Sequence, residues 1–257
     1  MPFLLMNTGV GMIKVTAQDE RMRGETERLS IFRVTEKDRN STVDVVVREF
    51  PLTIVLNSQK LTTLLCSPQN LDYLAIGFLA SEGLIKGKGV IKKIIVDDQK
   101  GIVRVAAEVD NRARGQAKVE SSIEISTHEV FTLMDEFVQR SQVFRATGGV
   151  HSAALCNTRD ILVFSEDIGR HNAIDKIFGQ CILQDIPTAG HLIITSGRVS
   201  SEILLKVARE NIPLLISKAA PTNLGVRLAS DLGMTLTGFA RGRKMNIYAN
   251  EWRLRDG

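Results

Sequence analysis

Glycines and basic side chains follow several short apolar runs in the second half of the chain, a combination that suits phosphate binding. A glycine lets a ligand approach backbone amides, and an arginine or lysine supplies positive charge. One such loop is often only a turn that caps a helix, so the hypothesis of phosphate binding rests on several such loops occurring together. The residues are Gly169, Arg170, His171 and Asn172 after one run, Ser196, Gly197, Arg198 and Ser200 after the next, and Lys218 after a third.

Two further segments carry similar residues. Gly148 and Gly149 precede an apolar run that begins with His151, and a basic run follows the final apolar segment. A histidine can act as acid, base or ligand contact, although a lone histidine is more often structural. No carboxylate partner for His151 or His171 can be assigned from the sequence. The basic run consists of Phe239, Ala240, Arg241, Gly242, Arg243 and Lys244.

The elements that must position these residues alternate along the chain. Strands are predicted near residues 150–156, 161–165, 192–195, 213–217 and 234–239, with helices near 171–184, 200–210 and 222–232. This alternation is typical of a largely parallel sheet covered by helices. Ligands of such sheets bind beyond the carboxyl ends of the strands, where the loops converge. The sequence therefore predicts a single anion-binding rim, with Asp175 and Lys176 pairing on the surface of the first helix.

The sequence of the first half of the chain predicts two smaller structural units. Residues 1–42 are expected to form an arm or edge element, and residues 43–122 a small α+β domain that ends in a polar loop at 110–122. Within that domain we expect paired strands at 43–47 and 52–56, a helix from Ser67-Pro68 to Gly83, and a hairpin of 91–96 with 102–109. Residues 123–257 are expected to form the α/β domain, and its first helix is predicted to carry a capping box of Ser126 and Glu129.

Composition limits the classes of function. The 257 residues are 44% hydrophobic and 24% charged, as in an ordinary globular protein. A net charge of +4 with only 5% aromatic residues does not favour nucleic-acid binding. No apolar run is long enough to cross a bilayer and no leader is recognisable, so we expect a cytoplasmic protein without membrane insertion. The three cysteines, Cys66, Cys156 and Cys181, are too widely spaced for a metal-binding pair and are expected to be reduced.

Several catalytic signatures are absent from the sequence. A zinc deaminase needs His-x-Glu and Pro-Cys-x-x-Cys, and neither occurs, so no zinc is expected. The Gly-x-x-x-x-Gly-Lys-Ser/Thr loop, the Gly-x-Ser-x-Gly elbow and the complete Gly-x-Gly-x-x-Gly fingerprint are also missing. A binding scaffold and an enzyme that acts on another nucleotide stay open as alternatives.

Four motifs resemble the FdhD/NarQ family of formate dehydrogenase accessory proteins, over residues 43–248. They are LAIGFLASEG at 74–83, TGGVH at 147–151, GRHNAIDK at 169–176 and TSGRVSSE at 195–202. The resemblance implies a cytidine-deaminase-like α/β fold, a homodimer, and binding of the molybdenum bis(molybdopterin guanine dinucleotide) cofactor as cargo. Its GDP-like moieties are then expected at the loops above and at residues 239–244. The implied partners are a cysteine desulfurase and formate dehydrogenase.

The chain departs from this family at one position of chemical importance. The resemblance implies a sulfurtransferase that moves sulfur through a persulfide on a Cys-Gly-x-Cys loop, but residues 119–125 contain Ser121 and Ser122 and no cysteine. A serine hydroxyl cannot hold a transferable persulfide, because the relay needs a thiolate. Cys156 is a weak substitute, since it ends an apolar strand. The alternative is a cofactor-binding scaffold or chaperone without sulfurtransferase activity.

Overall fold

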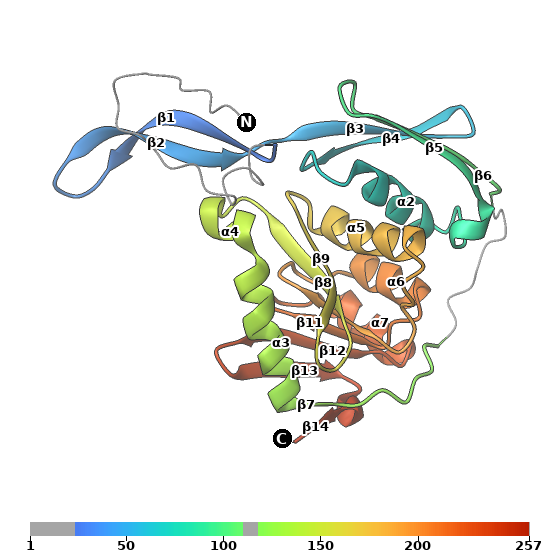
Figure 1. Cartoon of the computed structure of the whole chain (residues 1–257). Helices are drawn as coiled ribbons and strands as arrows, with labels where there is room; N and C mark the ends of the chain where they lie inside the picture. The colour runs from blue at the N-terminus through green and yellow to red at the C-terminus, as the bar shows by residue number, and fades with distance from the viewer. Residues whose placement is uncertain (1–23, 110–117, 257) are drawn as a thin grey trace, which may run out of the picture.

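The computed structural model describes residues 24–109 and 118–256, which form a mixed α/β fold of six α-helices and four sheets. Figure 1 shows a four-stranded sheet and helix α2 resting on helix α5 of a larger unit, with a hairpin projecting to one side. No helix in these two described ranges is long and apolar enough to cross a membrane. Residues 110–117 of the expected polar loop lie outside the description.

The larger unit is built on a six-stranded sheet in the order β13-β12-β11-β10-β8-β9. Strands β10, β11 and β12 are parallel, whereas β8 is antiparallel to β9 and β10, and β13 is antiparallel to β12. The sheet is therefore mixed, and the largely parallel prediction holds for its centre. The strands are β8 (His151–Cys156), β9 (Ile161–Asp167), β10 (Leu192–Thr195), β11 (Leu214–Ser217), β12 (Thr235–Arg241) and β13 (Lys244–Ala249).

Helices cover both faces of this sheet. On one face Ile174, Ile203 and Ala229 pack with the sheet residues in one core cluster, and on the other face Leu133 and Phe137 do so in a second. The predicted capping box is confirmed: Ser126 Oγ accepts a hydrogen bond from Glu129 N, and Glu129 accepts one from Ser126 N. The helices are α5 (Arg170–Leu183), α6 (Ser201–Arg209) and α7 (Asn223–Asp231) on the first face, with α3 (Thr127–Arg140) and the short α4 (Gln142–Thr147) on the other.

The smaller unit has the strand order β4-β3-β6-β5, and helix α2 (Leu71–Ser81) packs on it. The hairpin of β5 with β6 is confirmed, but the expected pairing of residues 43–47 with 52–56 is wrong. The tight turn lies instead at Asn57 and Ser58, both with left-handed backbones (φ 47° and 71°), and it joins β3 to β4. The strands are β3 (Phe50–Leu56), β4 (Gln59–Cys66), β5 (Ile91–Asp97) and β6 (Ile102–Ala107).

Helix α2 starts later than expected. Asn70, with a φ of 53°, precedes the first helical residue, so the prediction of a start at Ser67-Pro68 is wrong. Ser67 has another role, because its amide donates a hydrogen bond to Asp167 Oδ2 at 3.1 Å. Gly83 follows the helix with a φ of 77°, as predicted for a left-handed terminator.

The projecting hairpin consists of β1 (Thr26–Val34) and β2 (Arg39–Val47), so the described part of the expected arm is a two-stranded ribbon. Its register places Phe32, Val34 and Val43 on one face, and their exposed fractions are 64%, 68% and 57%. The remaining short elements are two 3₁₀ helices, Lys88–Val90 and Glu251–Arg253, and a parallel pair of β7 (Ile125–Ser126) with β14 (Leu254–Arg255).

Helices α2 and α5 approach each other at two glycines. A Cβ on Gly77 would collide with the backbone oxygen of Asp175, and a Cβ on Gly179 would collide with that of Tyr73. Each helix therefore has a glycine, which lacks a side chain, at the point where the backbone of the other helix lies against it. This contact fixes the small unit on the large one.

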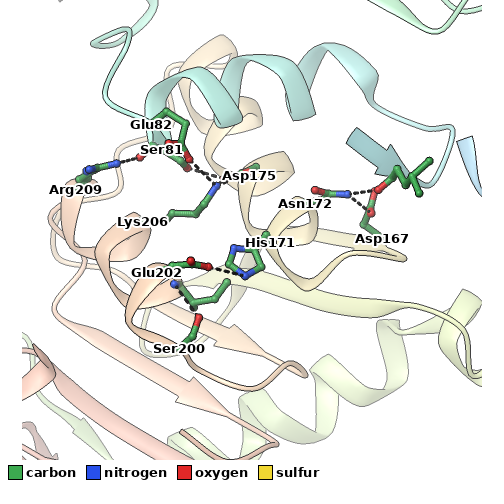
Figure 2. A network of polar contacts seen from close by, with 12 residues as sticks. Ser81, Glu82, Asp167, His171, Asn172, Asp175, Ser200, Glu202, Lys206 and Arg209 are labelled. Atoms are coloured by element: carbon green, nitrogen blue, oxygen red, sulfur yellow. Dashed lines mark hydrogen bonds and ion pairs between the residues drawn. The ribbon is translucent and has the colours of Figure 1, made fainter. Parts of the chain in front are cut away.

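Two buried ion pairs on α5 lie at the same junction, and Figure 2 shows the pair of Asp175 with Lys206. Lys176 Nζ lies 2.7 Å from Asp167 Oδ2, and Lys206 Nζ lies 2.7 Å from Asp175 Oδ2. Ser81 on α2 donates a 2.6 Å hydrogen bond to Asp175. The prediction that Asp175 and Lys176 pair on the helix surface is wrong, because both are 1% exposed and take partners from other elements.

Gly179→Ala should destabilise the protein, because the added methyl group forces α2 and α5 apart. We expect a loss of about 1–3 kcal/mol or more in the free energy of unfolding, measured by urea denaturation. Gly89→Ala is the control, since a Cβ there meets nothing within 4 Å. Equal stability of the two variants would contradict the close helix contact.

Asp175→Asn should cost about 3–5 kcal/mol of unfolding free energy, because it leaves the buried Lys206 with only the more distant carboxylate of Glu82, 3.8 Å away. A double variant with Lys206→Met should recover part of this loss. The control is Asp185→Asn, which breaks the exposed pair with Lys88 and should cost less than about 1 kcal/mol. A similarly small loss for Asp175→Asn would show that the buried pair is not needed.

Candidate functional site

The loops singled out by the sequence leave one edge of the six-stranded sheet. Strands β9 to β12 end there, and β8, which runs in the opposite direction, begins there. The register shows this directly, since His151 is opposite Asp167, and Thr195 is opposite both Ala153 and Ser217. The loops therefore converge at one edge of the sheet, as predicted from the sequence.

His151, Arg170 and Arg198 form the first group at this edge. Ser196 Oγ lies 3.4 Å from His151 Nδ1 and accepts a hydrogen bond from Ser152 N at 2.9 Å. Burial lowers the pKa of His151, and the nearby charges of Arg170 and Arg198 lower it further. The imidazole is therefore held neutral beside two cations, an environment that favours an anion.

Arg170 is closely packed and incompletely bonded. A Cβ on Gly197 would lie 2.8 Å from Arg170 Cβ, so the glycine makes room for the arginine stem. Arg170 Nε is buried and has no hydrogen-bond partner among the residues that the structure describes. Buried donors are nearly always satisfied, so the unpaired Nε is an unusual feature of this edge.

A second basic group lies further along the same edge. Lys218, Arg241, Gly242 and Arg243 help to line a cavity of about 110 Å³ beside α3. Arg243 is paired with Asp135 at 2.8 Å, and Lys218 Nζ lies 5.8 Å from the centre of the Phe144 ring. Ala240 is buried in the core and Lys244 is exposed at the start of β13.

Hydrogen bonds to backbone oxygens connect the two basic groups. Lys218 N donates to Thr195 O at 3.0 Å, and Ser217 Oγ donates to Gly197 O at 2.8 Å. Phe239 N donates to Ala219 O while its φ of 53° places a bulky residue in the left-handed region, at a cost of about 1–3 kcal/mol. Such strain is common at ligand-binding segments. Here it directs the Phe239 ring to within 5.9 Å of the Arg241 guanidinium carbon.

Other predicted site residues have structural contacts. Asn172 Nδ2 donates to Leu65 O and to Asp167 Oδ1, and Ser200 Oγ caps α6 by accepting from Ile203 N. Gly169 N donates to Asp167 Oδ1. Gly148 ends α4 with a φ of 67°, and Gly149 packs on Val47. These residues shape the edge of the sheet.

His171 lines a separate cavity of about 380 Å³ bounded by α2, α5 and α6. Its Nε2 lies 3.7 Å from Glu202 Oε2 (Figure 2), and burial lowers its pKa, with Lys206 and Arg170 adding to the effect. The motif GRHNA thus contributes Arg170 to the edge, whereas His171 and Asn172 both line another cavity. Sequence order alone cannot distinguish these directions.

Sequence reasoning missed a pair of carboxylates, Glu25 and Glu166, in a third cavity of about 500 Å³ beside β9. Glu166 accepts hydrogen bonds from Val143 N and Phe144 N, both at 3.0 Å. Adjacent acidic residues directly after an apolar strand were a visible signal for Glu166. Nothing in the sequence around Glu25 indicated a partner so distant in the chain.

All three thiols of the chain are inaccessible. Cys66 and Cys156 are 0% exposed and Cys181 is 1% exposed. Burial raises the pKa of all three thiols, to about 12 for Cys66 and Cys181, so thiolate is scarce at neutral pH. Ser121 and Ser122 stand in the segment where relatives are expected to have cysteines, and Ser121 Oγ accepts a hydrogen bond from Ile123 N. The described residues contain no cluster of three His, Cys, Asp or Glu side chains that could hold a metal ion.

Comparison with known proteins agrees with this architecture. The FdhD/NarQ family profile matches residues 47–120 and 107–255. The chain is 40% identical to the sulfur carrier protein FdhD of Bacillus pumilus (strain SAFR-032), over 82% of this chain and 90% of that one. It is 38% identical to the sulfur carrier protein FdhD of Bacillus subtilis (strain 168), over 88% and 96% respectively.

A solved structure shares the fold. The crystal structure of a putative formate dehydrogenase accessory protein from Desulfotalea psychrophila superposes with a TM-score of 0.81 at 28% identity, and the match covers 90% of this chain and 100% of that one. The family profile, the sequence relatives and the solved structure therefore each match nearly the whole described chain. The chain belongs to the FdhD/NarQ family.

Proposed function

We propose that this protein assists the maturation of formate dehydrogenase by holding the molybdenum bis(molybdopterin guanine dinucleotide) cofactor as cargo. The observation that carries the proposal is the group of His151, Arg170 and Arg198 at one edge of the sheet, with an unsatisfied Arg170 Nε. Diphosphate oxygens are strong acceptors and match arginine donors. Lys218 and Arg241 extend the positive charge along that edge towards a second phosphate group.

The hydrogen bonds and charges available at this edge are sufficient for micromolar affinity. A hydrogen bond to a charged group contributes about 1.5–3 kcal/mol, and a helix amino terminus adds about 0.3–1 kcal/mol. Several such contacts reach the roughly 8 kcal/mol of micromolar binding. The molybdenum centre itself supplies the redox chemistry of the dehydrogenase, so the accessory protein needs only to bind and orient its cargo.

We propose further that this chain does not carry sulfur on a thiol of its own. Cys66, Cys156 and Cys181 are buried with raised pKa values, which supports loss of the persulfide step. The protein would then act as a chaperone that presents the cofactor between a cysteine desulfurase and formate dehydrogenase. Buried, reduced thiols also agree with the proposed cytoplasmic location.

The proposed assembly is a homodimer. The β1–β2 hairpin exposes Phe32, Val34 and Val43 on one face, and an isolated two-stranded hairpin is marginally stable in water. A partner that covers this face would stabilise the ribbon. A second copy of the chain is the partner that the family resemblance implies.

GDP should bind with a dissociation constant in the micromolar range in isothermal titration calorimetry. Arg198→Ala should weaken binding about tenfold or more, because a charge-assisted contact is lost. The control is Arg227→Ala, which removes an exposed arginine on α7 and should leave affinity unchanged. Absence of GDP binding, or equal affinity of the two variants, would contradict the proposed site.

Incubation with a cysteine desulfurase and cysteine should leave the intact mass of the protein unchanged, because its thiols are buried and protonated. A family member with the Cys-Gly-x-Cys loop is the positive control and should gain sulfur. Stable addition of sulfur to this chain under native conditions would show that sulfur transfer survives.

A further inference from the structure

Asp167 is a buried carboxylate at the end of β9, in the loop that leads to Arg170. Its exposed fraction is 0%, and the strand register places it opposite His151 at the basic edge of the sheet. A negative charge near this edge opposes the binding of an anion, because like charges repel. The hydrogen bonds of Asp167 show what an acid contributes at this position.

One oxygen of Asp167 holds the chain on both sides of Arg170. Asp167 Oδ1 accepts a hydrogen bond from Gly169 N at 2.9 Å and another from Asn172 Nδ2, also at 2.9 Å. Gly169 directly precedes Arg170, which is the first residue of α5, and Asn172 lies in the first turn of that helix. Figure 2 shows the side chain of Asn172 directed at Asp167. A single acceptor atom therefore fixes the backbone before and after the arginine.

The other oxygen of Asp167 fixes the same loop against the smaller unit. Asp167 Oδ2 accepts a hydrogen bond from Ser67 N at 3.1 Å and lies 2.7 Å from Lys176 Nζ. Lys176 Nζ also donates to Ser67 O, and Ser67 Oγ accepts from Ile168 N, both at 3.2 Å. The segment between β4 and α2 and the body of α5 thus both hold the loop that carries Arg170.

The side chain of Arg170 depends on this backbone for its direction. Its stem packs on Gly197, where an added Cβ would lie 2.8 Å from Arg170 Cβ. Its Nε is buried and makes no hydrogen bond within residues 24–109 and 118–256. No polar partner at Nε therefore orients the guanidinium, so packing and the position of the Arg170 backbone must do so. A binding group is effective when its supporting residues hold it in place before the ligand arrives.

Lys176 allows an acid to stand beside an anion-binding edge. Its ammonium group is 1% exposed and forms an ion pair with Asp167, so the two side chains together add no net charge to the edge. An ionised carboxylate has about four lone-pair sites. Four donors approach Asp167 from Ser67, Gly169, Asn172 and Lys176, and a serine or an asparagine at position 167 could not accept from all of them.

We propose that Asp167 is a positioning residue for the diphosphate-binding edge, because it fixes the backbone from which Arg170 reaches the ligand. The inference rests on the proposed function, since it concerns how that edge binds its ligand. It adds a residue that acts on binding through Arg170 and links the edge to the smaller unit through Ser67.

Calorimetric titration with GDP of wild-type protein, Asp167→Asn and Asp167→Ala tests the inference. Asp167→Ala removes both acceptor oxygens and should weaken GDP binding about tenfold or more, as expected when a charge-assisted contact is misplaced. Asp167→Asn keeps one acceptor oxygen and should have an intermediate affinity. The direction of the change is decisive, because the loss of a negative charge by itself would tighten the binding of an anion.

Asp175→Asn is the matched control. Asp175 is also buried in α5 and paired with a lysine, but its partners are Lys206 and Ser81 rather than the loop before Arg170. This variant should lose stability in urea and retain the GDP affinity of the wild type. If the unpaired Lys176 prevents Asp167→Ala from folding, the double variant Asp167→Ala/Lys176→Met removes both charges. It should show the same weakening, whereas an effect of charge alone would leave its affinity unchanged.

A double-mutant cycle with Arg170→Ala shows whether Asp167 acts through the arginine. In the Arg170→Ala background, Asp167→Asn should cause little further loss of GDP affinity, because the group that it positions is already absent. Additive losses would overturn the inference, and so would unchanged or tighter GDP binding by the single Asp167 variants. Equal weakening by Asp175→Asn would also overturn it, since the effect would then be one of general stability. Failure of the wild-type protein to bind GDP would contradict the proposed function itself.

Discussion

The burial of two ion pairs on α5 is the constraint on which the structure depends. Lys176 with Asp167, and Lys206 with Asp175, are removed from water, and each buried ion costs several kcal/mol unless its partners are in place. Ser67 and Ser81 complete the pairs from the smaller unit. Because the pairs are satisfied only in one arrangement, they specify how α2 and β4 dock on α5.

That arrangement also positions the basic edge. Helix α5 can approach α2 closely because Gly77 and Gly179 have no side chains, and its first turn then brings Arg170 against Gly197. The charge partners that stabilise the docking thus stand only a few residues from the arginine that faces the edge. The docking contacts and the proposed binding site therefore share helix α5, whose first residues face the edge and the His171 cavity while Asp175 and Lys176 are buried.

Much of the larger sheet could be predicted from sequence, because β10 and β11 are continuous apolar runs and the glycine–cation loops follow them. Strand β13 was missed because it lies at the edge of the sheet, where only Ala249 of its six residues is buried and Lys244 and Asn246 interrupt the apolar pattern. The pairing of residues 43–47 was wrong because the turn at Asn57 and Ser58 depends on left-handed backbones that their residue types only permit. The direction of Asn172 and the partners of Asp175 depend on distant elements, so no local pattern contains them.

The candidate site, like the fold, could be predicted from the sequence only in part. The edge that suits a diphosphate could be inferred from residue types, whereas the carboxylate cavity beside β9 required the fold to join Glu25 to Glu166 across 141 positions of sequence (166 − 25). The thiols of the chain are all in the core. The proposed cofactor carrier therefore has no accessible thiol among its three cysteines that could hold sulfur.

A crystal structure with bound GDP would show whether the basic edge holds the nucleotide. We expect diphosphate oxygens within hydrogen-bond distance of Arg170 and Arg198, at the edge where β9 to β12 end. An ordered nucleotide in the cavity of His171 and Glu202, with the basic edge left empty, would contradict this expectation.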